Sequence, residues 1–305
     1  MAWSEARLHA WLARREAPSV LVGSAGHDAA VLIPGHGRPV VCTDSCALGV
    51  HYSADVSPGL AGRKAANRAL SDLAATAATP HALLLALRAP ASTSEARMRA
   101  LIAAVDKAGR AAGAPLVAGD LSLVEGPESL AVTALGFLAG RRQAPGRDRA
   151  QVGDLIFVTG PVGGSRRTRH LRFAPRIAAG RWLFERGARA LMDVSDGLAL
   201  DLQRMARASG VRFCVQQVPV HADARRAARL DARSSLDHAL HDGEDHELIA
   251  TLSPKAAVRL LREAPDACPG LSLLGEVHEG SGLVLDLDGT RRTWKPSMGG
   301  WIHAS

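Results

Sequence analysis

Short apolar runs alternate with longer, alanine-rich amphipathic segments along this chain, and the alternation limits the folds that it can adopt. Short runs bounded by Gly, Pro or polar residues are typical of strands, whereas apolar residues at helical spacing are typical of helices. The sequence predicts strands over residues 20–22, 29–33, 39–43, 116–118, 130–138, 155–159, 190–194 and 211–215, and a β-rich end over 271–293. Because helices are predicted between strands in both halves, we expect an α/β or α+β protein with two domains.

The predicted helices carry recognisable start and stop signals. They cover residues 4–16, 58–78, 94–112, 175–187 and a segment from Ser195 or Asp196 to about residue 208. Ser4 and either Thr93 or Ser94 are expected to cap helices, because their hydroxyl oxygens can accept backbone N–H groups. Pro80 and Gly113 are expected to end helices.

A polar, basic stretch over residues 140–153 contains Pro and Gly and marks the predicted domain boundary. The 305 residues then divide into domains over 1–140 and 150–305. Aromatic residues make up only 4% of the chain, so the core must consist mainly of Ala, Leu and Val. The apolar run over 81–90 is far too short to span a bilayer.

Cysteine spacing and charge narrow the classes of function. The four cysteines form no CxxC pair, which favours a reducing compartment, and the N-terminal residues lack the pattern of a signal peptide, so we expect a cytoplasmic protein. The net charge of +7 would suit nucleic acid, but the arginines are mostly scattered and few aromatics lie among them. Nucleic-acid binding is therefore the least favoured function, and a membrane partner is not expected.

Five acidic stretches indicate a chemistry. Each sets aspartate beside Gly, Ser or Thr where a strand or helix is predicted to end, at Gly26–Ala30, Thr43-Asp44, Leu70–Leu73, Ala118–Asp120 and Met192–Gly197. Hard cations such as Mg²⁺ take several carboxylate oxygens and keep other positions for water and phosphate. The pattern therefore predicts a metal-dependent site for a nucleotide polyphosphate.

Simpler roles exist for several of these acids. Asp196 and Ser195 would both serve as helix N-caps, and for Asp196 the cap and the metal ligand are equally supported. Asp28 and Asp44 could form Asx turns, although their position after consecutive strands favours ligands. Asp72 lies inside a predicted helix, where no turn or cap explains it, so the metal role is favoured.

Other polar motifs are also open to two interpretations. His51 taken alone is more often a satisfied polar residue than a substrate contact, and Trp301 could simply fix the chain end to the core. Glu244 and its neighbour could form a solvated acidic turn. The loop over residues 160–165 could hold phosphate through backbone amides, but a plain tight loop is equally supported.

The order of motifs resembles the thiamine-monophosphate kinase family, within the superfamily of aminoimidazole ribonucleotide synthetase and selenophosphate synthetase. The resemblance covers nearly the whole chain and rests on the acidic stretches together with the segments 49–52, 153–160, 169–172, 193–198 and 243–248. It implies ATP-dependent phosphorylation of thiamine phosphate to thiamine diphosphate. It further implies Mg²⁺ as cofactor, two α/β domains and a homodimer formed through the N-terminal, ATP- and metal-binding domain.

The resemblance also implies roles for individual residues. The Mg²⁺ ligands would be Asp28, Asp44, Asp72, Asp120, Asp193 and Asp196, with Cys42 and Thr43 at positions that supply main-chain or hydroxyl oxygens. Nucleotide contacts would come from Gly119, Asp120, Arg147 and Ser195. Substrate contacts would come from His51, Glu244 and Trp301. No separate catalytic base is implied, because a phosphate oxygen is already an anionic nucleophile.

Four positions depart from the family pattern. His27 stands in place of the first Asp of Gly-Asp-Asp, Gly164 in place of the Asp of Gly-Asp-Ser, Ala69 in place of Asn, and Leu121 in place of a Thr. The replacement of acids by His27 and Gly164 makes the expected site less negative, which leaves two alternatives open. The chain could phosphorylate another acceptor, or it could bind nucleotide or thiamine phosphate without turnover.

Overall fold

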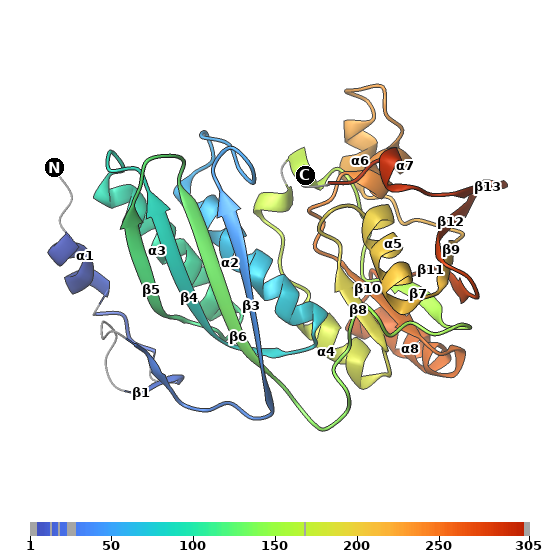
Figure 1. Ribbon diagram of the computed structural model, residues 1–305, viewed down its shortest axis with the longest axis horizontal. Helices are drawn as coiled ribbons and strands as arrows, with labels where there is room; N and C mark the ends of the chain where they lie inside the picture. Colours follow the sequence, from blue (N-terminus) through green and yellow to red (C-terminus); the bar gives the residue numbers. More distant parts are fainter. Residues whose placement is uncertain (1–4, 13, 18, 23–28, 168, 302–305) are drawn as a thin grey trace. The chain divides into compact units, whose positions relative to one another are not determined.

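The computed structural model describes residues 5–12, 14–17, 19–22, 29–167 and 169–301. The chain forms two compact units, the first comprising Met1–Leu73 with Ala78–Arg141 and the second Ala74–Ala77 with Arg142–Ser305. Each unit contains a sheet and helices (Figure 1), which confirms the predicted mixture of α and β structure. The predicted cap Ser4, His27 and the predicted ligand Asp28 lie outside the described residues.

The first unit is built on a four-stranded sheet with the strand order β3-β6-β4-β5. The strands are β3 (Arg38–Ala47), β6 (Ser129–Leu138), β4 (Thr79–Ala89) and β5 (Leu116–Leu123). Neighbouring strands are antiparallel except for β4 and β5, which are parallel. The remaining elements are helices α1 (Glu5–Leu12), α2 (Pro58–Ala75) and α3 (Glu95–Ala111) and the short paired strands β1 (Leu21–Val22) and β2 (Val31–Leu32).

Helices α2 and α3 cover one face of this sheet (Figure 1). Strand β6 shows why this face is buried, since Leu130, Val132 and Ala134 are fully buried while the residues between them are only half-buried. This is the alternation expected when one face of a sheet packs against helices. The thiol of Cys42 donates to the carbonyl of Ala69 over 3.2 Å, which fixes β3 against α2.

Two strands continue past the aspartates that were predicted to end them, so that prediction was wrong. Strand β3 runs through Asp44 to Ala47, and β5 runs through Asp120 to Leu123. Both are edge strands, and an edge tolerates acids because one side of the strand remains open to solvent or to a side-chain partner.

The ends of the helices in this unit were predicted with mixed success. Ser94 caps α3 by accepting the N–H of Arg97, as expected, and Gly113 follows the helix with a φ of +81°. Helix α2 ends earlier than predicted, at residue 75, and the chain turns at Ala77 in the left-handed conformation. Pro80 is not the stop signal, because it lies within β4, a central strand that the sequence analysis did not recognise in the run over 81–90.

The second unit contains a seven-stranded sheet with the order β13-β12-β9-β11-β7-β10-β8. Its strands are β7 (Leu155–Val158), β8 (Ala190–Asp193), β9 (Arg212–Val215), β10 (Leu248–Leu252), β11 (Ser272–His278), β12 (Gly282–Leu287) and β13 (Thr290–Thr293). Its helices are α4 (Ile177–Glu185), α5 (Leu198–Ser209), α6 (Ala222–Ala227), α7 (Ser235–His241) and α8 (Pro254–Ala267). Short 3₁₀ turns cover Ser165–Arg167, Arg169–Leu171 and Pro296–Met298.

The main core of this unit lies between the sheet and α5. It consists largely of Ala, Leu and Val, as the low aromatic content predicted, and includes the fully buried Leu198, Leu202 and Met205. Helix α5 begins after Gly197, whose φ is +117°. Neither Ser195 nor Asp196 is its N-cap, so the predicted capping role was wrong for both.

The four cysteines are free thiols, and three of them are buried. In the part of the chain that the structure describes, no helix is both long and apolar enough to cross a membrane.

Candidate active site

The loop after β8 is held by a carboxylate that sequence analysis did not single out. Asp201, in the first turn of α5, is fully buried, and one of its oxygens accepts the backbone N–H groups of Ser195 at 2.9 Å and Asp196 at 3.0 Å. Its other oxygen accepts from Arg204 at 3.1 Å. Burial is the main reason that the pKa of Asp201 is raised to about 8, and the charge of Asp196 adds to it.

Predicted site residues of the second unit gather around this loop. The backbone N–H of Glu244 donates to the carbonyl of Ser195 over 2.7 Å, and that of Trp301 donates to the carbonyl of Asp196 over 2.8 Å. The Asp196 carboxylate forms an ion pair with Arg204. The structure therefore brings Glu244 and Trp301 to the Ser195-Asp196 segment, although both are distant from it in sequence.

The indole of Trp301 is accessible and already contacts a cation. Its side chain is among the exposed large apolar groups, and the guanidinium carbon of Arg166 lies 4.9 Å from the ring centroid. An aromatic face that holds one cation in this way can also stack on a cationic heterocycle.

Asp193 lies at the end of β8 and contacts a buried histidine. Its Oδ2 is 3.1 Å from Nδ1 of His246, whose ring stacks on Phe173 with centroids 4.0 Å apart. Among the described residues, Nε2 of His246 has no hydrogen-bond partner. The neutral tautomer with hydrogen on Nδ1 satisfies this arrangement best, because it donates to the Asp193 carboxylate and leaves no buried N–H unmatched.

In the glycine loop over residues 160–165, carboxylates of the same unit accept backbone N–H groups. The N–H of Gly163 donates to Asp245 over 2.9 Å, and the N–H of Gly164 donates to Asp242 over 3.0 Å. These two amides are therefore not directed at a phosphate, which favours the structural interpretation of the loop. A side chain at Gly164 would place its Cβ 2.3 Å from the backbone of Asp223, which explains why this chain has glycine there.

In the first unit, β3 presents Cys42 and Asp44 towards α2. Both oxygens of Asp44 accept from Arg68, at 2.8 Å from Nε and 3.0 Å from Nη2. Thr43 lies on the opposite face of the sheet, where its hydroxyl contacts Thr133 at 3.1 Å. The side chains of these three predicted ligands therefore do not converge, because successive residues of a strand point to opposite faces.

Asp120 is separated from Asp44 by the whole width of the sheet. Asp44 pairs with Val132 on β6, whereas Asp120 pairs with Ala86 on β4, which in turn pairs with the β6 residue next to Val132. Adjacent residues of a strand point to opposite faces, so the two aspartates lie on opposite faces as well as on opposite edges of the sheet. Three strand spacings amount to about 14 Å. Asp120 accepts from Ser122 at 2.9 Å, and its neighbour Gly119 is exposed on the same edge strand.

His51 has a structural contact at one ring nitrogen. Its Nδ1 accepts the backbone N–H of Ala47 over 3.0 Å, and its carbonyl accepts from Lys64 over 2.6 Å. In the neutral imidazole the hydrogen is then on Nε2.

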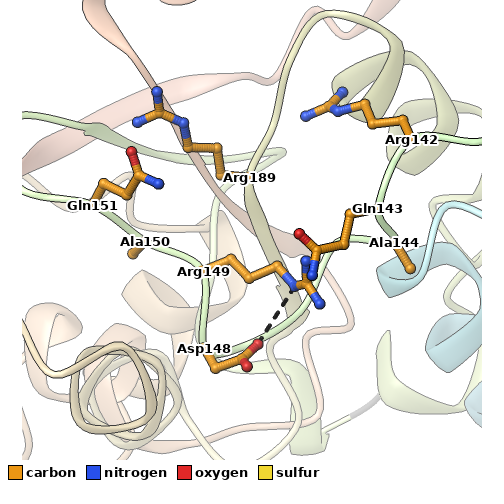
Figure 2. A pocket seen from close by; sticks show the side chains of 8 residues that line it. All are labelled: Arg142, Gln143, Ala144, Asp148, Arg149, Ala150, Gln151 and Arg189. Atoms are coloured by element: carbon orange, nitrogen blue, oxygen red, sulfur yellow. Dashed lines mark ion pairs between the residues drawn. The ribbon is translucent and has the colours of Figure 1, made fainter.

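Arg147 belongs to a basic segment of the second unit. Its side chain is exposed, and its carbonyl accepts the hydroxyl of Ser209 over 3.0 Å. A cavity of about 560 Å³ lies beside this segment, and Figure 2 shows Arg142, Arg149 and Arg189 among the side chains that line it. Burial, with the charge of Arg189 added, lowers the pKa of Arg142.

The carboxylate oxygens of Asp72, Asp120, Asp193 and Asp196 are chemically suited to Mg²⁺. However, no three His, Cys, Asp or Glu side chains form a metal-binding group within the described ranges. The donor types fit the ion, but both oxygens of Asp44 are already bound to Arg68, and one oxygen of Asp196 is paired with Arg204.

Residues 26–138 match the family model of the AIR synthase related protein, N-terminal domain. The chain is 36% identical over 281 residues to thiamine-monophosphate kinase of Rhodopirellula baltica, covering 88% of this chain and 87% of that protein. The crystal structure of thiamine-monophosphate kinase from Stenotrophomonas maltophilia K279a is 33% identical, covers 93% of this chain and 94% of its own, and has a TM-score of 0.76. The structure of AaThiL complexed with AMPPCP and TMP is 26% identical, covers 87% of each chain, and also has a TM-score of 0.76.

Fold and sequence together define an AIR synthase related protein. Similarity of this extent to several thiamine-monophosphate kinases narrows the class further. The chain belongs to the thiamine-monophosphate kinase family.

Proposed function

We propose that this chain transfers the γ-phosphoryl group of ATP to thiamine phosphate, giving thiamine diphosphate and ADP. The observation that supports the proposal most is the similarity to thiamine-monophosphate kinases over 88% of the chain. The related structure in complex with AMPPCP and TMP supports the same pair of ligands. The gathering of Ser195, Asp196, Glu244 and Trp301 offers these ligands a set of contacts in the second unit.

The chemistry requires little from the protein beyond positioning and charge. An oxygen of the thiamine phosphate attacks the γ-phosphorus, the bond from that phosphorus to the β-phosphate oxygen breaks, and ADP leaves. Mg²⁺, when bound, neutralises the phosphate charges. Asp28, Asp72, Asp120, Asp193 and Asp196 are the residues that we propose to hold it.

Other residues would orient the two substrates. Ser195, Gly119 and Arg147 are proposed to contact the nucleotide, and Asp201 would keep the N–H groups of the 195–196 segment in place. Trp301 is proposed to stack on the cationic thiazolium ring, since the guanidinium of Arg166 already lies over its indole ring. Glu244 and Nε2–H of His51 would complete the substrate contacts.

The proposal includes a homodimer in which each site uses both copies. Asp72 lies on α2, which covers one face of the four-stranded sheet, whereas Asp120 lies on the other face. A single copy of this unit therefore cannot supply both carboxylates to one cation. The open face also carries Val41, which is 68% exposed and could be covered by a second copy.

Two variants test these ideas together. Asp72→Asn keeps the size of the side chain and should abolish formation of thiamine diphosphate while leaving the circular dichroism spectrum unchanged. Asp120→Asn should do the same. When equal amounts of the two inactive proteins are unfolded and refolded together, about a quarter of the wild-type activity should return, because half of the dimers are mixed and each mixed dimer contains one intact site of two. Turnover by Asp72→Asn alone would contradict the metal assignment, and failure to recover activity would contradict the shared site.

A further inference from the structure

The Asp44–Arg68 pair occupies a position where the family resemblance expects a metal ligand. Two nitrogens of Arg68 bind the two oxygens of Asp44, at 2.8 and 3.0 Å, in the parallel geometry that makes arginine a strong partner for carboxylates. Both side chains are largely shielded from water, with 14% and 24% of their surface exposed. Shielding strengthens such a pair relative to one at an open surface.

Helix geometry brings the same guanidinium towards a second predicted ligand. Arg68 and Asp72 are four residues apart on α2, so they lie on the same face of the helix, one turn from each other. The nearby contact from Cys42 to the carbonyl of Ala69 shows that this part of α2 lies against β3. A fixed positive charge therefore lies beside both Asp44 and Asp72.

We propose that the guanidinium of Arg68 takes the place of one divalent cation in this chain. The inference rests on the proposed kinase function, because it concerns how charge is balanced at that site. Mg²⁺ requires carboxylate oxygens at about 2.1 Å in octahedral geometry. It could reach Asp44 only if the arginine left a partly buried carboxylate and lost its own two hydrogen bonds, which is unfavourable.

The replacement of a divalent cation by Arg68 also agrees with the altered sequence of the acidic stretch at Gly26–Ala30. His27 stands where the resemblance expects an aspartate, so the site has one negative charge less. Replacing a divalent cation by a guanidinium removes one positive charge. Within the first unit the two changes cancel, so phosphate groups would meet the same charge from this unit with fewer bound cations.

Counting bound cations tests the inference without relying on turnover. The full chain with AMPPCP is titrated with Mn²⁺, and free Mn²⁺ is measured by electron paramagnetic resonance. Arg68→Ala should bind about one more Mn²⁺ per chain than wild type, because Asp44 becomes available as a ligand. Arg68→Lys retains a positive charge and should bind the wild-type number. Arg97→Ala breaks another bidentate pair of this unit, with Glu128, and should also leave the number unchanged.

Asp44→Asn decides the question even if Arg68→Ala folds poorly. The uncharged amide of this variant is a much weaker ligand than a carboxylate, so a cation held by Asp44 would be lost, whereas the number of bound Mn²⁺ should stay at the wild-type value if arginine already occupies this position. A lower number in Asp44→Asn, or no extra Mn²⁺ in a folded Arg68→Ala, would overturn the inference. The proposed kinase reaction fails by a different observation, the absence of thiamine diphosphate from the wild-type reaction.

Discussion

Removal of the Asp201 carboxylate should loosen the loop that carries Ser195 and Asp196. This side chain is fully buried; it accepts two backbone N–H groups from the loop, at 2.9 and 3.0 Å, and a third hydrogen bond from the guanidinium of Arg204. Asp201→Ala leaves the two amides without their acceptor, which is a fully buried side chain. The substitution therefore perturbs the position of the loop while every residue proposed to contact ATP keeps its own side chain.

The size of the effect follows from the lost hydrogen bonds. A buried polar group left without a partner costs about 1–3 kcal/mol, so two amides correspond to about 2–6 kcal/mol. The substitution also removes the unfavourable burial of the carboxyl, which is the reason for its raised pKa and offsets part of the loss. We expect Asp201→Ala to lower the free energy of unfolding by about 2–4 kcal/mol. Asp201→Asn should cost less, since its amide oxygen can still accept both N–H groups.

Urea unfolding and calorimetric titration with AMPPCP and Mg²⁺ measure the two consequences separately. Nucleotide affinity, measured well below the unfolding transition, should fall at least about tenfold in Asp201→Ala, which corresponds to about 1.4 kcal/mol. Glu128→Ala is a matched control, because Glu128 is similarly buried and accepts three hydrogen bonds from Tyr52 and Arg97. It should lose stability but keep its nucleotide affinity. Wild-type affinity in a destabilised Asp201→Ala would refute the idea that Asp201 positions the loop.

Three further outcomes are expected. The pKa of Asp201 is about 8 in the folded protein against an ordinary value of 3.8, so its proton is bound more tightly in the folded state. The stability of wild type relative to Asp201→Asn should therefore be highest below pH 4 and fall as the pH rises to about 8. The same difference in unfolding free energy between the two proteins at pH 5 and at pH 8, measured by urea unfolding, would contradict this. Trp301→Ala should raise the KM for thiamine phosphate about 2- to 30-fold through loss of a cation–π contact of about 0.5–2 kcal/mol, with the KM for ATP as the control. Gly163→Ala should lower the melting temperature, because a Cβ at this position, where φ is +97°, would lie 2.5 Å from the backbone of Ala239; an unchanged temperature in a thermal scan would show that the loop adapts.

Local signals in the sequence predicted those elements whose limits depend on local chemistry. Helix α3 begins after Ser94 and is followed by Gly113 because the cap and the left-handed residue act within one turn of the helix. The buried stripe of α5 follows from helical spacing in the same way. Strand β4 was missed because an apolar run alone does not distinguish a central strand from other buried segments.

The partners of the acidic residues could not be predicted, because they are distant in sequence or depend on how elements pack. Asp44 does not end β3, since Arg68 on α2 compensates its charge at the sheet edge. Asp44 and Asp120 were both expected to bind Mg²⁺, and the strand order places them on opposite edges of the sheet. The contact between Asp193 and His246 joins residues more than fifty positions apart. Aspartate spacing indicated the type of chemistry, whereas the arrangement of the ligands required the topology of the sheet.

The central claim is that this chain phosphorylates thiamine phosphate. Phosphorus NMR of the purified full chain with Mg²⁺, ATP and thiamine phosphate follows both products in one sample. We predict that thiamine diphosphate and ADP appear in equal amounts and that neither forms after Mg²⁺ is removed with EDTA. ADP without thiamine diphosphate, or no product from a protein whose melting temperature rises with both ligands, would contradict the claim.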